Sequence, residues 1–156
     1  MTMTITRQSA LDHEDDLCEA PWSHKDILEL GNAIVADSQN KNLTVAVAMF
    51  FRGQRIFQVG LEGTTADNDS WIMRKVNTVE FTGHSSLALR EKVEALNIQE
   101  QELGFRTSDL AICGGGFPLK TNGVLIGIAV VSGLPHLEDH DLIVEHLRLF
   151  KQKRGW

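Results

Sequence analysis

The sequence has few of the features that would place the protein in a specialised class. Its only two cysteines, Cys18 and Cys113, lie far apart and match no metal-ligand spacing, so neither a disulfide framework nor a cysteine-rich metal site is expected. No apolar run approaches the roughly 18 residues that a membrane span requires, and residues 1–7 lack the apolar core of a signal peptide. We therefore expect a reduced, cytoplasmic protein with no membrane partner.

The sequence also lacks an excess of positive charge. Its net charge is −6, and its positive residues are scattered rather than gathered in the basic stripe that binding to phosphates requires, so we expect no nucleic-acid partner. The acidic segment 12–19 and the basic segment 148–154 are most simply read as two solvated ends, and contact between them, within or between chains, is the alternative.

The length of 156 residues, 42% of them hydrophobic, suits one compact domain. Ser23 and Asp26 form a capping signal that predicts a helix start. Residues 43–51 are apolar or small on both alternating faces, which predicts a strand covered on both sides. A short turn joins this run to residues 55–61, so the two runs should form a hairpin.

The second half of the chain predicts more strands and a final helix. Residues 110–113 have the character of a strand, and Asn122-Gly123 predicts a tight hairpin turn into a strand at residues 124–131. A helix is expected over residues 138–150. The hairpins favour one antiparallel sheet over a doubly wound parallel sheet.

The most informative polar stretch of the sequence is residues 63–79, which gathers acids, amides, an indole and two cations at one junction between a loop and a helix. Asp67, Asn68, Asp69 and Ser70 are all good caps, so a helix is predicted to start near Ser70, and to break near residues 83–85 before a second segment. The cations Arg74 and Lys75 follow within two turns, where they oppose the helix dipole unless an acid or a bound anion compensates them. The alternative is a well-capped helix with a solvated basic turn.

Three segments, at residues 63–75, 113–118 and 131–140, together resemble the haem-degrading-domain superfamily, which includes GlcG, HbpS and the C-terminal domain of PduO. The likeness is to its short, single-domain branch and covers nearly everything from Pro21 onward. The residues that match the pattern of this branch in the first segment and shortly after it are Gly63, Thr64, Asp67, Asn68, Asp69, Trp71, Arg74, Lys75, Asn77, Ser85 and Ser86.

This resemblance implies a profilin-like α/β sandwich of the α+β class, with a central antiparallel sheet of about five strands and helices on both faces. It also implies a homo-oligomer. The resulting division is an N-terminal arm at residues 1–20 and a single GlcG/HbpS-like domain at residues 21–156. The resemblance identifies no reaction, so no enzyme activity is assigned.

We expect the functional site to combine the polar stretch with the glycine-rich segment. It can bind a small molecule, with Arg74 and Lys75 facing an anionic group and Trp71 as an apolar wall, or it can anchor an oligomeric interface. Burial of Trp71 in its own core is the third alternative. The candidate site residues are Asp67, Asn68, Asp69, Trp71, Arg74, Lys75, Asn77, Gly115, Gly116 and Pro118.

Haem is a hypothetical cofactor of this chain, suggested only by the resemblance to the haem-degrading-domain superfamily. An axial ligand would come from His84, Cys113, His136 or Met73, each of which also has an ordinary structural role available to it. His136 and His140 are four residues apart, a spacing that suits a metal on a continuous helix. Pro135 instead favours a helix that starts after His136, so no metal site is predicted.

Overall fold

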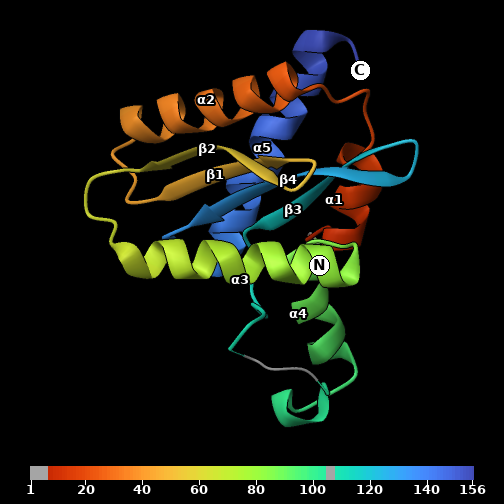
Figure 1. The fold of residues 1–156 in the computed structure, drawn as a ribbon. Coiled ribbons are helices and arrows are strands. Elements are labelled where there is room, and N and C mark those ends of the chain that lie inside the picture. The colour runs from red at the N-terminus through yellow and green to blue at the C-terminus, as the bar shows by residue number, and fades with distance from the viewer. Residues whose placement is uncertain (1–6, 105–107) are drawn as a thin grey trace, which may run out of the picture.

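The computed structural model describes residues 7–104 and 108–156, which build one antiparallel sheet with helices on both faces (Figure 1). The strands are β1 (Ala46–Phe51), β2 (Gln54–Gly60), β3 (Gly116–Thr121) and β4 (Val124–Ser132), in the order β2-β1-β4-β3. The helices are α1 (Ala10–Leu17), α2 (His24–Asn40), α3 (Ala66–Thr82), α4 (Ser86–Ala95) and α5 (His136–Arg154), with a short 3-10 helix at Glu100–Glu102. None of the described helices is long and apolar enough to cross a membrane.

Alternation along β1 explains why the sheet is covered on both faces. Val47 and Met49 belong to a large core with α2 and α5, whereas Ala46, Ala48 and Phe50 belong to a smaller core with α3. Since successive side chains of a strand point to opposite faces, one apolar run supplies both cores. The predicted two-sided burial of this strand is confirmed.

Both predicted hairpins are confirmed. The turn between β1 and β2 has positive φ values of 49° at Arg52 and 79° at Gly53, and the turn between β3 and β4 has 51° at Asn122 and 77° at Gly123. Two successive left-handed residues give the type I′ geometry that matches the twist of paired strands.

The expectation of about five strands is wrong for the described part of the chain, which has four. Residues 110–113 do not form a strand, because their backbone bonds to α3 instead of the sheet. The Ala111 N–H donates to the Thr78 hydroxyl at 2.8 Å, and that hydroxyl donates to the Ala111 carbonyl at 2.9 Å. The likeness to profilin stays a prediction.

Two helix starts differ from those predicted. α3 begins at Ala66 rather than near Ser70, because Thr65 is the N-cap and forms a capping box with Asn68. α5 begins at His136 with Pro135 as its N-cap, so His136 lies inside the helix rather than before it. The predicted break is confirmed: Gly83 ends α3 in a left-handed conformation and Ser85 caps α4.

The N-terminal segment contributes a helix that the sequence analysis did not anticipate. α1 starts from a capping box of Ser9 and Asp12 and packs against α4 and α5. After it, the chain runs beside β3, where the Lys120 N–H donates to the Cys18 carbonyl at 2.8 Å. Lys151 Nζ donates to the Glu19 carbonyl at 2.8 Å, so the two ends meet within one chain and the expectation of two solvated ends is wrong here. The division at residue 20 stays a prediction.

Candidate functional site

The first turns of α3 lie against the end of β4 and the start of α5. Asp67, Asn68, Trp71 and Lys75 share one side of α3 because they are spaced by about one helical turn. They border a cavity of about 260 Å³, which we call the polar cavity. Its other lining residues are Cys113, Ser132, Gly133, Leu134, His136 and Asp139.

A buried ion pair forms part of the wall of the polar cavity. Lys75 Nζ lies 3.0 Å from Asp139 Oδ2 and 2.8 Å from the Val131 carbonyl oxygen, and each charged side chain is only 3% exposed. Burial raises the pKa of Asp139, while Lys75 and the N–H groups of Leu134 and Gly133 act in the opposite direction. The alternative of a solvated basic turn is therefore wrong for Lys75.

Cys113 and His136 meet at the same cavity, as neutral groups. Burial raises the pKa of the Cys113 thiol, which stays protonated at neutral pH. His136 Nδ1 accepts a hydrogen bond from the Gly114 N–H at 3.2 Å, and burial followed by the charge of Arg90 lowers the pKa of His136. Both groups can accept or donate a hydrogen bond without adding charge.

His136 and His140 do not share a site, although α5 holds both. His140 is fully buried and its Nε2 lies 2.9 Å from His13 Nδ1 on α1, away from the Gly114 contact of His136. Within residues 7–104 and 108–156, no group of three or more His, Cys, Asp or Glu side chains is arranged to hold a metal ion.

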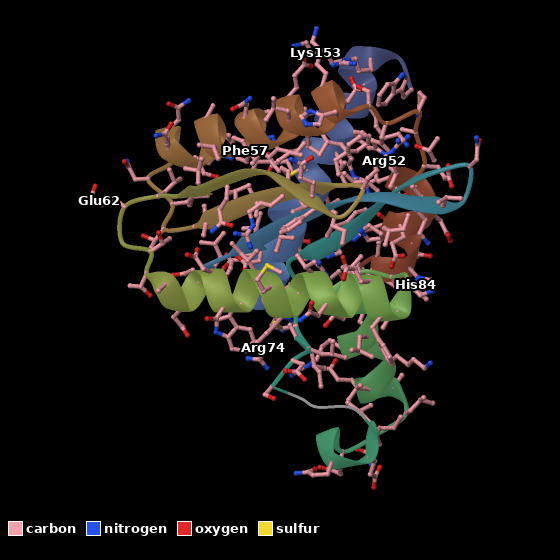
Figure 2. All side chains as sticks on the ribbon, viewed as in Figure 1. Arg52, Phe57, Glu62, Arg74, His84 and Lys153 are labelled. Carbon is pink, nitrogen blue, oxygen red and sulfur yellow. The ribbon has the colours of Figure 1, made fainter. Side chains whose placement is uncertain are left out.

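Three of the predicted site residues lie on another side of α3. Asp69 accepts from Gln58 at 2.8 Å, Arg74 donates to the Leu110 carbonyl at 3.1 Å, and Asn77 donates to the Asp109 carbonyl at 2.9 Å. Figure 2 shows Arg74 on the side of α3 away from the sheet. The Arg74 guanidinium lies 4.0 Å from the centre of the half-buried Trp71 ring. The structure thus divides the predicted site into two.

Of the glycine-rich segment, Gly115 packs against the Lys75 ammonium, which borders the polar cavity. Its φ of 125° favours glycine, and a Cβ atom at this position would lie 2.5 Å from Lys75 Nζ. Gly116 packs against the stem of Lys75 and donates its N–H to the Ser86 hydroxyl at 2.9 Å. Pro118 lies farther along β3, buried and paired with Ile128, so it is not part of the site.

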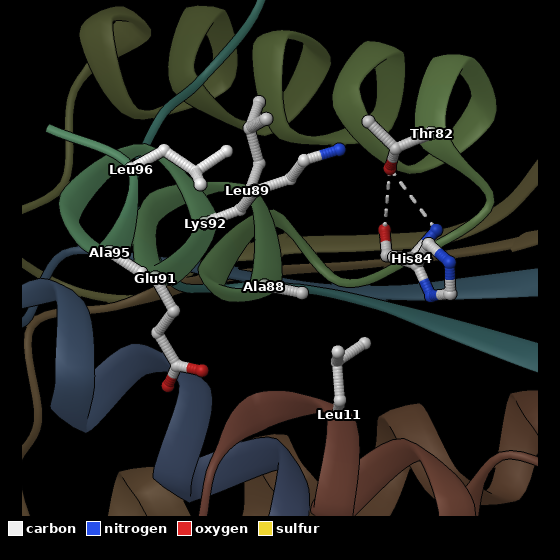
Figure 3. A pocket seen from close by; sticks show the side chains of 9 residues that line it. All are labelled: Leu11, Thr82, His84, Ala88, Leu89, Glu91, Lys92, Ala95 and Leu96. Atoms are coloured by element: carbon white, nitrogen blue, oxygen red, sulfur yellow. Dashed lines mark hydrogen bonds between the residues drawn. The ribbon is translucent and has the colours of Figure 1, made fainter. Parts of the chain in front are cut away.

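A second and larger cavity of about 690 Å³ lies between α1 and α4 (Figure 3). We call it the apolar slot, because five of its lining residues are alanine or leucine. Glu91 has its carboxylate tied to the Ala10 N–H at 3.0 Å, and Lys92 is exposed. The lining residues are Leu11, Thr82, His84, Ala88, Leu89, Glu91, Lys92, Ala95 and Leu96.

His84 lies at the rim of the apolar slot with its ring orientation fixed. Its Nδ1 is 2.9 Å from Glu14 Oε1, and the second Glu14 oxygen accepts from the N–H and hydroxyl of Ser85. The Thr82 hydroxyl accepts a hydrogen bond from the His84 N–H and donates one to the His84 carbonyl (Figure 3). The His84 side chain is 53% exposed, and among the described residues no hydrogen bond reaches its Nε2.

The sequence model described as "Haem degrading protein HbpS-like" matches residues 23–148, which is most of the chain. The chain belongs to the HbpS-like family. Its relatives include a UPF0303 protein of Yersinia enterocolitica, 34% identical over 143 residues that cover 88% of this chain and 83% of the relative. A UPF0303 protein of Streptomyces avermitilis is 37% identical over 137 residues, covering 86% of this chain and 83% of the relative.

Solved structures agree with the HbpS-like fold. The crystal structure of Ybr137w superposes with a TM-score of 0.82 at 26% identity, covering 92% of this chain and 87% of that one. The PduO C-terminal domain, solved as a haem complex, superposes with a TM-score of 0.67 at 21% identity. The match covers 83% of this chain and 94% of that domain. HbpS superposes with a TM-score of 0.61 at 16% identity, and the match covers 88% of this chain and 92% of HbpS. The last two likenesses show the fold alone.

Glu14, which orients His84 in this HbpS-like chain, is not among the residues predicted for the site. Glu14 lies in the acidic N-terminal segment, where its buried position was not apparent. The capping pair Ser9 and Asp12 was the available signal, because a helix starting there places Glu14 one turn before Cys18.

Proposed function

We propose that this HbpS-like chain is a small-molecule-binding protein that takes haem into the apolar slot, with His84 as the axial ligand. The observation that carries the proposal is an imidazole at the rim of an apolar slot, with Nδ1 held by the buried Glu14 carboxylate and Nε2 left to bind. Histidines that ligate metals in proteins have this arrangement. Haem is the ligand considered because the PduO C-terminal domain was solved with it.

The residues of the slot fit a haem group. A volume of about 690 Å³ lies within the range of roughly 300–1,000 Å³ typical of ligand sites, and Leu11, Leu89 and Leu96 supply an apolar wall. The exposed Lys92 ammonium can pair with a propionate. When bound, haem would supply an iron that takes a histidine nitrogen as ligand. No reaction is proposed.

The other candidate ligands fit less well. Cys113 and His136 line the polar cavity, whose volume of about 260 Å³ is below the usual range for an organic cofactor. The Met73 sulfur accepts a hydrogen bond from Arg55. His84 is therefore the ligand to test.

A hemin titration followed at the Soret band tests this proposal. We expect saturation at one haem per chain, loss of the saturable signal in His84→Ala, and affinity reduced about tenfold in Glu14→Gln, because the carboxylate fixes the ligating ring. His136→Ala is the matched control and should bind as the wild type does. Saturable binding by a folded His84→Ala protein would contradict the assignment.

We also propose that the chain forms a homo-oligomer, with a non-catalytic assembly or partner-interaction role as the alternative function. The half-buried Trp71 is not part of either sheet core, and Phe81 on the same helix is 67% exposed. Large apolar side chains at a surface are typical of interfaces. The cytoplasmic location likewise stays a prediction.

Light scattering tests the oligomer. We expect a dimer or larger assembly for the wild type and dissociation on Trp71→Ala with the helical circular dichroism retained. A folded, monomeric wild type would refute the proposal. An unchanged assembly in the folded Trp71→Ala variant would exclude Trp71 from the interface.

A further inference from the structure

The polar cavity brings together hydrogen-bond donors from three elements. One is the ammonium of Lys75, which has three N–H groups. Two of them are accounted for by the Val131 carbonyl and Asp139. A Cβ atom at Gly115 would lie 2.5 Å from Nζ, so only glycine lets the ammonium keep this position. Within residues 7–104 and 108–156, no acceptor bonds to the third N–H, which a ligand can therefore use.

The second donor is the hydroxyl of Ser132, at the end of β4. Ser132 is 4% exposed and lines the polar cavity, yet no hydrogen bond reaches its hydroxyl from residues 7–104 or 108–156. Val131 belongs to the core on the α2 and α5 face, so alternation directs the Ser132 side chain to the α3 face. The Ser132 oxygen is not among the fully enclosed side-chain atoms that lack a partner, so it opens onto the polar cavity, where a ligand can bond to it.

The third set of donors is the first turn of α5, which borders the polar cavity at His136. Pro135 provides no side-chain hydrogen bond as the N-cap, and its carbonyl accepts from the Glu138 N–H at 2.8 Å, so among the described residues the His136 and Leu137 N–H groups are the ones left without an acceptor. The positive end of the helix dipole adds to the attraction for an anion at this place.

The charges of the polar cavity limit the ligand to one negative charge. Asp139 accepts from Lys75, Leu134 and Gly133, so its charge is fully matched inside the wall. Asp67 remains as an exposed carboxylate and would repel a polyanion. The volume of about 260 Å³ admits only a small molecule, and the Trp71 indole offers an apolar surface to its body.

We propose that the polar cavity binds a small organic monocarboxylate, whose carboxylate accepts from Lys75 Nζ, the Ser132 hydroxyl and the N–H groups of His136 and Leu137. The apolar part of the ligand lies against Trp71. This site is separate from the apolar slot and does not depend on haem binding.

Benzoate and benzamide are the paired probes, because they share one shape and differ in charge. In ¹⁵N-resolved NMR titrations at pH 7, benzoate should produce saturable shifts at the Trp71 indole N–H and at the Gly133 and Leu134 amides. Benzamide should bind at least about tenfold more weakly, since hydrogen bonds to a charged acceptor are the stronger ones. Equal binding of the two probes, or tighter binding of benzylamine, would overturn the proposal.

Two variants locate the carboxylate. Ser132→Ala should weaken benzoate about tenfold through the loss of one hydrogen bond to a charged group, while Ser70→Ala, an exposed serine of α3, should leave it unchanged. The double variant Lys75→Met with Asp139→Leu removes the pair without leaving a buried charge and should abolish saturable binding. Wild-type benzoate affinity in either folded variant, Ser132→Ala or the double one, would also overturn the proposal.

Discussion

Lys75→Met is expected to destabilise the fold by about 3–5 kcal/mol at pH 7, because it leaves the Asp139 carboxylate buried without its cation. Urea unfolding followed by circular dichroism measures this loss. Since burial raises the pKa of Asp139, a carboxylate without Lys75 takes up a proton more readily as the pH falls. The loss should therefore be smaller at pH 5 than at pH 7.

The double variant Lys75→Met with Asp139→Leu provides the comparison. Replacing both members of a buried pair by apolar groups of similar size is often neutral or stabilising, so it should recover most of the lost stability. If Lys75→Met alone unfolds at the same urea concentration as the wild type, the pair does not have the energetic role that its burial implies.

Stability should fall steeply in acid because of His140. Burial, followed by the charge of His13, lowers the pKa of His140 from 6.5 to about 3. Between these two values the unfolded chain binds a proton that the folded chain does not, so stability is complete above about pH 6.5 and decreases as the pH falls toward 3. The expected loss between pH 7.5 and pH 4 is roughly 3 kcal/mol from this group alone.

The slope of stability against pH in His140→Leu tests this assignment. Removing the imidazole should reduce the fall in the free energy of unfolding as the pH decreases below about 6.5. His24→Leu, at an exposed position, should keep the wild-type slope. Asp139 has the opposite effect, because its raised pKa makes the folded chain bind more protons near pH 4. The difference between His140→Leu and wild type cancels that contribution. An unchanged slope in a folded His140→Leu protein would show that another group controls acid sensitivity.

Local sequence signals predicted the hairpins, the start of α2 and the break between α3 and α4 well. Asn122-Gly123 and the Ser23 capping box act over two to four residues, so their effect does not depend on distant parts of the chain. Residues 110–113 were predicted wrongly because Thr78, more than thirty residues earlier, satisfies the backbone of Ala111. Such a contact depends on tertiary packing, which a strand pattern does not report.

The predicted site shows the same division. Four residues of the polar stretch reach one cavity, since helical spacing alone places Asp67, Trp71 and Lys75 together. The sequence could not reveal that Asp139, far along the chain, neutralises Lys75. It also could not reveal that α1 brings Glu14 to His84, because that contact depends on how α1 packs against α4.

The two edge strands of the sheet, β2 and β3, differ in how far their outer backbone groups are already paired, which determines where a further strand could be added. At β3 the segment after α1 forms a parallel bridge between Glu19 and Lys120, which takes up backbone groups of that margin. At β2 no described strand pairs with the outer side. An extended peptide or another β-strand that joined this sheet would therefore enter beside Gln54–Gly60, and a chain cut back beyond Ala20 would expose a second place for such joining.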